Sequence, residues 1–111
     1  MSLTLEEANR IVAGAISKAQ ELNIRVSAAV VDAGGRLVAF GRMDNAIWGS
    51  AYGSQGKAVA SAAFGRASGE MIMGQGAVPI LKDGVVIGAC GVGGGTSQED
   101  EDCARAGVER L

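Results

Sequence analysis

The sequence predicts a single α+β domain in which an antiparallel sheet is flanked by helices. Its 111 residues match the length of one domain, and a composition that is 48% apolar and 20% charged is enough to form one core. Two pairs of short apolar runs are each joined by turn-forming residues, which is typical of β-hairpins. The expected order is helix, hairpin, helix, hairpin, helix, without the strand and helix alternation of parallel sheets.

The first element is expected to be a helix. Thr4-Leu5-Glu6-Glu7 forms a capping box, in which the Thr4 hydroxyl and the Glu7 carboxylate bind each other's backbone N–H groups. Apolar residues then recur at steps of three and four, at Ala8, Ile11, Val12, Ala15, Ile16, Ala19 and Leu22. This spacing predicts one apolar stripe on a helix of about five turns, ending near Asn23.

The first hairpin is expected from residues 26–31 and 36–43, joined by the turn Asp32-Ala33-Gly34-Gly35. One face of its second strand carries Val38, Phe40, Arg42 and Asp44. Arg42 and Asp44 would therefore emerge together where this face leaves the core. An exposed ion pair contributes only about 0–1 kcal/mol, so these residue types fit a solvated strand end as well as a fork for a ligand carboxylate.

A second helix is expected over residues 46–64, which are mostly Ala, Gly and Ser. Its helical periodicity gives two stripes. One stripe holds Trp48, Tyr52, Val59, Ala62 and Ala63, and the other holds Ser50, Gly53, Ser54, Lys57, Ser61 and Phe64. Two stripes predict two neighbours, and small residues permit close approach to a sheet or another subunit, so we expect a buried helix.

Lys57 lies on the small, polar side of this helix. A buried ammonium group needs a carboxylate, carbonyl groups or an anionic ligand, because an isolated buried charge is too costly. Asp32, Asp44 and a bound ligand are the candidate partners. The alternative is that the side chain extends to solvent.

The remaining chain predicts a loop, a second hairpin and a final helix. Residues 65–77 resemble a loop, with a short piece at 70–73 of undetermined state. Residues 78–81 and 85–92 form the hairpin around the turn at 82–84, and Pro79 marks a strand start or a sheet edge. After the glycines at 93–95, a second capping box, Thr96-Ser97-Gln98-Glu99, begins a helix expected to reach Leu111.

Charge and hydropathy argue against two classes of partner. The net charge is −2 and the ten Lys and Arg residues are scattered, so no basic stripe for nucleic acid is present. No apolar run approaches the roughly 20 residues of a membrane span, and the N-terminus lacks the positive charge of a signal peptide. We expect a cytoplasmic protein that binds neither nucleic acid nor membrane.

Histidine and cysteine usage limits the chemistry. The chain has no histidine, which removes Ser-His-Asp and Cys-His catalytic arrangements and the commonest metal ligand. Cys90 and Cys103 lie 13 positions apart without a CxxC motif, so we expect no metal site and two buried thiols, with a disulfide between them left open. Acid and base work would fall to Asp32, Asp44, Lys57 or Tyr52.

Several motifs occur in an order that resembles a known family. They are VVDAGG, RMD, the pattern K-A-x-x-x-A-A-F-G-R and GVGGGT. With the sequence around them, they make nearly the whole chain similar to the GlcG-like family, which includes HbpS-like heme-binding proteins and the C-terminal domain of PduO-type corrinoid adenosyltransferases. The resemblance implies a profilin-like fold, homo-oligomers and small-molecule binding. It also makes heme a candidate cofactor, although this chain has no histidine to ligate iron.

The resemblance implies ligand-binding positions at Asp32, Arg42, Asp44, Lys57, Gly93 and Gly94. Our leading hypothesis is a small-molecule-binding domain that holds an anionic, carboxylate-bearing ligand, with Arg42 and Lys57 supplying the positive charge. A lyase or isomerase acting on a small carboxylated metabolite is the first alternative, with Lys57 or an aspartate moving a proton. A structural or assembly module is the second.

Overall fold

The computed structural model describes residues 2–71 and 74–111 of the chain. Its elements are helix α1 (Leu5–Glu21), strands β1 (Ser27–Asp32) and β2 (Leu37–Arg42), helix α2 (Gly49–Phe64), the short 3-10 helix η1 (Ser68–Glu70), strands β3 (Ala77–Lys82) and β4 (Val85–Gly93), and helix α3 (Ser97–Val108). The predicted α+β class and the predicted order of elements are confirmed.

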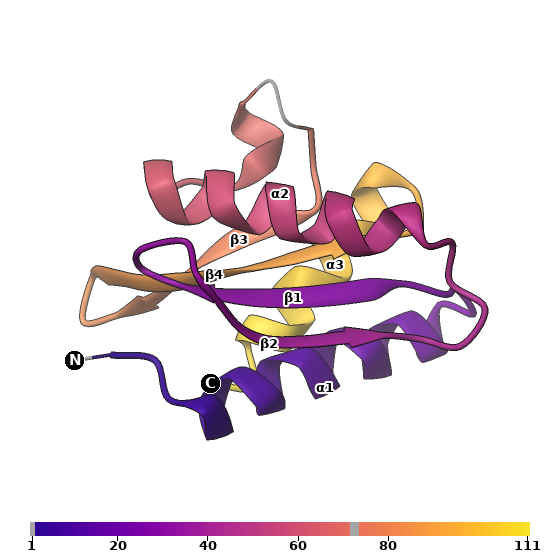
Figure 1. Ribbon diagram of the computed structural model, residues 1–111, viewed down its shortest axis with the longest axis horizontal. Helices are drawn as coiled ribbons and strands as arrows, with labels where there is room; N and C mark the ends of the chain where they lie inside the picture. The colour runs from indigo at the N-terminus through magenta and orange to yellow at the C-terminus, as the bar shows by residue number, and fades with distance from the viewer. Residues whose placement is uncertain (1, 72–73) are drawn as a thin grey trace.

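The molecule has three layers, with the sheet in the middle. The four strands run in the order β2-β1-β4-β3, and every neighbouring pair is antiparallel. Helix α2 covers one face, and α1 and α3 lie together on the other (Figure 1). Strands β2 and β3 are therefore the sheet edges, and Pro79 lies in β3 as an edge position allows.

The main core lies between the sheet and the α1–α3 layer. Ile11, Val30 and Ile80 are fully buried there. Glycine permits the close approach of the two helices: a Cβ added at Gly107 would lie 2.5 Å from the carbonyl oxygen of Ile11. The small second cluster, beneath α2, consists of Val31, Ala58, Ala62 and Ala89.

Both capping boxes form as predicted. The Thr4 hydroxyl accepts from the Glu7 N–H at 3.1 Å, and the Glu7 carboxylate accepts from the Thr4 N–H at 3.0 Å. Thr96 and Glu99 repeat this arrangement at the start of α3. The prediction that α3 reaches Leu111 is wrong: α3 ends at Val108, because the last N–H groups bond three residues back in tighter turns.

Both hairpins form, and each contains a register shift. Val30 pairs with Ala39 but Val31 pairs with Leu37, so an extra residue, Val38, stands in β2. Val38 packs against the same cluster as Ala39. The prediction that Val38 shares a face with Phe40 and Arg42 is therefore wrong, because a bulge changes the alternation of side chains.

Helix α2 begins at Gly49, later than predicted, because residues 43–46 form a turn in which Asn45 has a φ of 69°. The serines of its small polar stripe face the sheet, where Ser54 is fully buried and a Cβ added at Gly91 would collide with the Ser54 carbonyl oxygen. The aromatic stripe faces outward, with Trp48 73% and Tyr52 71% exposed. The predicted stripes are therefore only partly correct, because Gly53 and Phe64 of the small polar stripe are exposed and Ala62 of the aromatic stripe is buried.

The segment after α2 is mostly loop, as predicted. Gly65 ends the helix in the left-handed region, with a φ of 66°, and η1 follows at Ser68–Glu70. Of the short piece expected at 70–73, residues 72 and 73 lie outside the described residues. None of the helices described here is long and apolar enough to span a bilayer.

Candidate functional site

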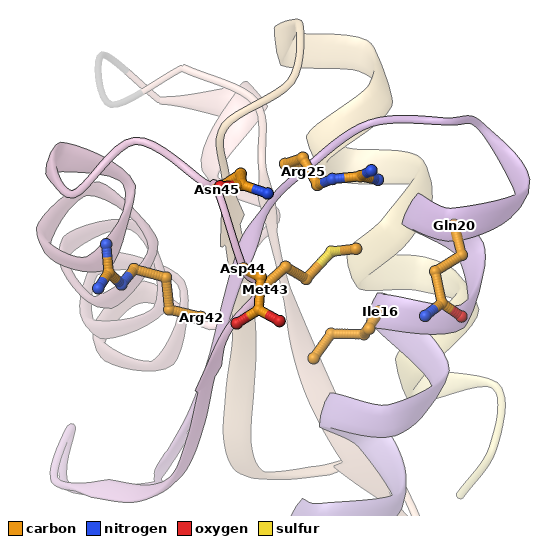
Figure 2. A pocket seen from close by; sticks show the side chains of 7 residues that line it. All are labelled: Ile16, Gln20, Arg25, Arg42, Met43, Asp44 and Asn45. Atoms are coloured by element: carbon orange, nitrogen blue, oxygen red, sulfur yellow. The ribbon is translucent and has the colours of Figure 1, made fainter.

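A groove of about 590 Å³ lies between the second half of α1 and the segment that follows β2. Its lining residues are Ile16, Gln20, Arg25, Arg42, Met43, Asp44 and Asn45 (Figure 2). The volume falls within the range of roughly 300–1,000 Å³ that is usual for small-molecule pockets. The lining combines an apolar wall with two guanidinium groups, two amides and one carboxylate.

The apolar wall is positioned by the end of the first hairpin. Met43 donates its backbone N–H to the carbonyl oxygen of Val26 at 3.0 Å, and its sulfur accepts from the Val26 N–H at 3.4 Å. These two contacts fix Met43 on the side of the strand that faces α1, where its side chain lies near Ile16 (Figure 2). The groove thus has an apolar surface beneath its polar rim.

Two arginines supply the positive charge. Arg25 lies at one end of the groove near Asn45, whereas the Arg42 guanidinium lies on the opposite side of the strand from Ile16 and Gln20 (Figure 2). The only described hydrogen bond of the Arg42 guanidinium is a long one, at 3.4 Å, to the carbonyl oxygen of Ala46. Within residues 2–71 and 74–111, neither arginine forms an ion pair with a carboxylate.

Asp44 also lines the groove, as the sequence placed it beside Arg42. The groove therefore carries two positive charges and one negative charge. A single ligand carboxylate would bring this set close to neutrality, and a second would make it anionic. The charge balance favours a ligand with one or two carboxylates over a polyphosphate.

Asp32 lies at the opposite end of β1 from the residue that pairs with Arg42. Its carboxylate oxygen Oδ1 accepts from the N–H groups of Gly34 and Arg36 at 2.9 and 3.0 Å. This is the local bonding that aspartate makes in turns. The structure therefore places Asp32 in the hairpin turn and not beside the groove.

Lys57 pairs with neither Asp32 nor Asp44, the two aspartates expected from the sequence, but with Asp100. Its ammonium nitrogen lies 3.4 Å from Oδ2 of Asp100 and 3.4 Å from the carbonyl oxygen of Gln75. Because Gln75 leads into β3 and Arg42 ends β2, the two cations sit toward opposite edges of the sheet. The expectation that Asp32 or Asp44 pairs with Lys57 is wrong.

Asp100 is a buried acidic residue that was not predicted from the sequence as a site residue. It is 4% exposed. Burial raises the pKa of its carboxyl group, while hydrogen bonding from the Gly95 N–H and the charge of Lys57 act in the opposite direction. Its burial could have been predicted from helical spacing. Asp100 lies three and four residues before Cys103 and Ala104, which face the core, so it shares their side of α3.

Gly93 and Gly94 lie in the close contacts around the end of β4. A Cβ at Gly93 would lie 3.2 Å from the Ser50 carbonyl oxygen, and one at Gly94, where φ is +125°, would lie 2.5 Å from that of Arg25. The next N–H, from Gly95, already donates to Asp100 at 2.8 Å. Among the described residues, the contacts of this loop are therefore internal: Gly93 and Gly94 allow close packing, and Gly95 donates a hydrogen bond to the Asp100 carboxylate.

The two cysteines are free and buried. Burial raises the pKa of the Cys90 thiol to about 12 and that of Cys103 to about 11. Such thiols are poor nucleophiles and poor metal ligands at neutral pH. In the described part of the chain, no three His, Cys, Asp or Glu side chains gather as a metal site requires.

Comparisons with known proteins agree with this architecture. A family model described as "Haem degrading protein HbpS-like" matches residues 3–109. Protein GlcG of Escherichia coli K12 is 38% identical, in an alignment that covers 81% of this chain and 80% of GlcG.

Solved structures show the same fold. A double mutant of Streptomyces reticuli HbpS superposes with a TM-score of 0.95 and 27% identity, covering 100% of this chain and 88% of that one. The PduOC:heme complex superposes with a TM-score of 0.94, covering 100% and 96%, and its 23% identity shows the shared fold alone. The profilin-like architecture is confirmed, and the chain belongs to the HbpS-like family.

Proposed function

We propose that this chain is a small-molecule-binding domain that holds a carboxylate-bearing ligand in the groove between α1 and the end of β2. The observation that carries the proposal is the Arg25 guanidinium, which has no carboxylate partner among the described residues, in a groove whose apolar wall is Ile16 and Met43. The Arg42 guanidinium, also without such a partner, lines the groove from the opposite side of the strand. The family supports it, since the matching family model is described as "Haem degrading protein HbpS-like", which implies a small-molecule ligand.

The charged and the apolar lining residues of the groove would contact different parts of the ligand. A guanidinium group is planar and binds a carboxylate through two parallel hydrogen bonds, so Arg25 or Arg42 would fix the charged end of the ligand. The apolar part of the ligand would lie on Ile16 and Met43. The Gln20 and Asn45 amides can both donate and accept, which suits the remaining polar groups.

Heme fits this groove only in part. A heme carboxylate could bind the Arg25 guanidinium, and the heme ring would suit an apolar wall. Heme iron is held by histidine, cysteine, methionine or tyrosine, and this chain has no histidine. The one sulfur at the groove, in Met43, already accepts a backbone hydrogen bond. The lining residues do not fit iron ligation, so the proposal is limited to carboxylate recognition.

Catalysis would need a proton-transfer group at the groove. The enzyme hypothesis gave that role to Lys57 or an aspartate, but Lys57 is engaged by Asp100 on the other side of the sheet. Asp44 is the ionisable acid among the lining residues. Binding is therefore the function that these contacts support best.

The test is a binding measurement with matched charge variants. Heme and a panel of mono- and dicarboxylates would be titrated against the protein by calorimetry, after mass spectrometry of any molecule that copurifies. Arg25→Gln and Arg42→Gln should each weaken binding of the best ligand about 10-fold or more, because each removes a charge-assisted hydrogen bond. Arg36→Gln is the control, since its side chain is 85% exposed in the β1–β2 turn.

Two results would contradict the proposal. One is that no ligand in the panel, and no copurifying molecule, binds the native protein. The other is that Arg36→Gln weakens binding as much as Arg42→Gln, which would mean that only the overall charge matters.

A further inference from the structure

Four polar side chains that line the groove have no partner inside the chain. Within residues 2–71 and 74–111, the side chains of Gln20, Arg25, Asp44 and Asn45 make no hydrogen bond and no ion pair. Free polar groups beside an apolar wall are typical of a small-molecule site. Their charges therefore indicate which ligand would complete them.

The opposite charges of Arg25 and Asp44 are held apart at the open end of the first hairpin. Val26 and Met43 are joined by hydrogen bonds of 3.0 and 3.4 Å, and Arg25 directly precedes the first of them. Asp44 directly follows Met43. Figure 2 shows the Met43 side chain between the Arg25 guanidinium and the Asp44 carboxylate. The groove thus presents a positive group and a negative group with an apolar surface between them.

The backbone on both sides of this surface is fixed by contacts within the chain. Asn45 turns the chain in the left-handed region, with a φ of 69°, and the Ala46 N–H closes the turn onto the Met43 carbonyl oxygen at 3.1 Å. On the other side, the Arg25 carbonyl oxygen packs against Gly94, where an added Cβ would lie 2.5 Å from it. The two charged side chains therefore start from preorganised positions, which lowers the entropy cost of binding.

A second carboxylate on the ligand would be poorly matched. The Arg42 guanidinium lies across the strand from Ile16 and Gln20 and bonds to the Ala46 carbonyl oxygen. A dicarboxylate held by Arg25 along the Met43 surface would point its far end at Asp44, and like charges repel. An ammonium group at the same end would instead be attracted and would donate to the carboxylate.

We propose that the ligand of this groove is a zwitterion whose carboxylate binds Arg25 and whose ammonium group binds Asp44, with a short apolar chain lying on Met43. The inference rests on the proposed function and narrows a carboxylate-bearing ligand to ω-amino carboxylates. Both protein charges are on exposed residues, so binding is weak and is weakened further by salt.

The test is a titration of the whole protein with a matched series at low ionic strength. The series is β-alanine, γ-aminobutyrate, δ-aminovalerate and ε-aminocaproate, each compared with the fatty acid and the dicarboxylate of the same carbon number. Nuclear magnetic resonance measures weak affinities, and the side-chain amide signals of Gln20 and Asn45 show whether the ligand lies in the groove. The best amino carboxylate should bind at least about 3-fold tighter than its two analogues, as one partly exposed charge pair allows.

Norvaline tests the separation of the charges. It is an isomer of δ-aminovalerate in which the ammonium and carboxylate groups are adjacent, so it cannot reach Arg25 and Asp44 together across Met43. It should show no preference over valerate, the matching fatty acid.

Asp44→Asn tests the residue assigned to the ammonium group. It keeps the size of the side chain and removes the charge, so the amino carboxylate should bind no more tightly than its fatty acid. Asp83→Asn is the control, because it makes the same change of charge in the β3–β4 turn at the opposite end of β4. Its preference for the amino carboxylate should equal that of the native protein.

The outcomes separate this inference from the proposed function. If a fatty acid or a dicarboxylate binds in the groove at least as tightly as every amino carboxylate, the zwitterion is wrong and carboxylate binding stands. The same holds if Asp44→Asn keeps the full preference. If no member of the series shifts the Gln20 and Asn45 signals, both proposals fail.

Discussion

The ammonium group of Lys57 lies 3.4 Å from the carboxylate of Asp100, and this ion pair ties α2 to α3 across the end of the sheet. The two side chains are only 16% and 6% exposed. Asp100 also accepts the Gly95 N–H, which holds the turn between β4 and α3. The buried Asp100 carboxylate on α3 thus contacts both α2, on the other face of the sheet, and the loop between β4 and α3.

Lys57→Met should lower the free energy of unfolding by about 3–5 kcal/mol, because it leaves the Asp100 carboxylate buried without its counter-charge. Chemical denaturation measures this. The control is Arg10→Met, whose pair with Glu6 is exposed and should cost less than about 1 kcal/mol. If both variants lower the free energy of unfolding by the same amount, the buried pair stabilises the protein no more than an exposed pair does.

Acid stability should depend on the contact between Glu7 and Lys82. Lys82 donates to the Glu7 carboxylate at 2.6 Å, and this bond, with the Thr4 N–H, lowers the pKa of Glu7 to about 2. A lowered folded-state pKa gives stability that is present above the ordinary value of 4.5 and is lost as the pH falls toward 2. In Lys82→Met, the free energy of unfolding should therefore fall less steeply than in the native protein as the pH is lowered from 4.5 toward 2.

Lys18→Met provides the comparison for that measurement. Lys18 pairs with Glu21 at 3.4 Å, but the Glu21 side chain is 70% exposed. Its pH profile should follow that of the native protein. A steep native-like profile in Lys82→Met would contradict the assignment to Glu7.

Gly107→Ala should destabilise the protein although alanine is the better helix former. Helix propensity alone predicts a gain of about 1 kcal/mol. The added Cβ would lie 2.5 Å from the Ile11 carbonyl oxygen, so α1 and α3 must separate, at a cost of about 1–3 kcal/mol. The sign of the change in thermal or chemical stability decides between propensity and packing.

Cys90 and Cys103 should resist thiol reagents in the native protein. Both are buried, and burial raises their pKa values to about 12 and 11, so little thiolate exists at pH 8. A colorimetric thiol assay should show slow labelling that becomes fast in denaturant. Rapid native labelling of either cysteine would mean that the α1–α3 layer opens readily.

Local signals in the sequence predicted much of this fold. The Thr4 and Thr96 capping boxes and the Asp83-Gly84 turn depend on neighbours within four residues, and all three form as expected. Pro79 indicated a sheet edge, and β3 is one. Such features need no knowledge of the rest of the chain.

Long-range features were predicted less well. Asp100 lies 43 positions from Lys57, and no local pattern indicates that the two meet at the end of the sheet. The bulge at Val38 changed a face assignment, because it depends on the register with β1. The two stripes of α2 were only partly correct, since Phe64 of the small polar stripe is exposed and Ala62 of the aromatic stripe is buried against the sheet.

The candidate site was predicted in part. The proximity of Arg42 and Asp44 follows from their spacing on a strand end, and both line the groove. Arg25 was not proposed, because it precedes β1 and reaches the groove lined by Arg42 and Asp44 only in the folded chain. Asp32, Gly93 and Gly94 were proposed as ligand-binding positions from the motif resemblance, and Lys57 also from its place on a helix expected to be buried. Their contacts in the structure are explained by turns, an ion pair and packing.

The most direct measurement is a crystal structure of the protein with its best-binding carboxylate. The account predicts the ligand in the groove, with a carboxylate within hydrogen-bond distance of Arg25 or Arg42 and its apolar part on Ile16 and Met43. A ligand bound elsewhere, with the groove filled by water alone, would contradict it.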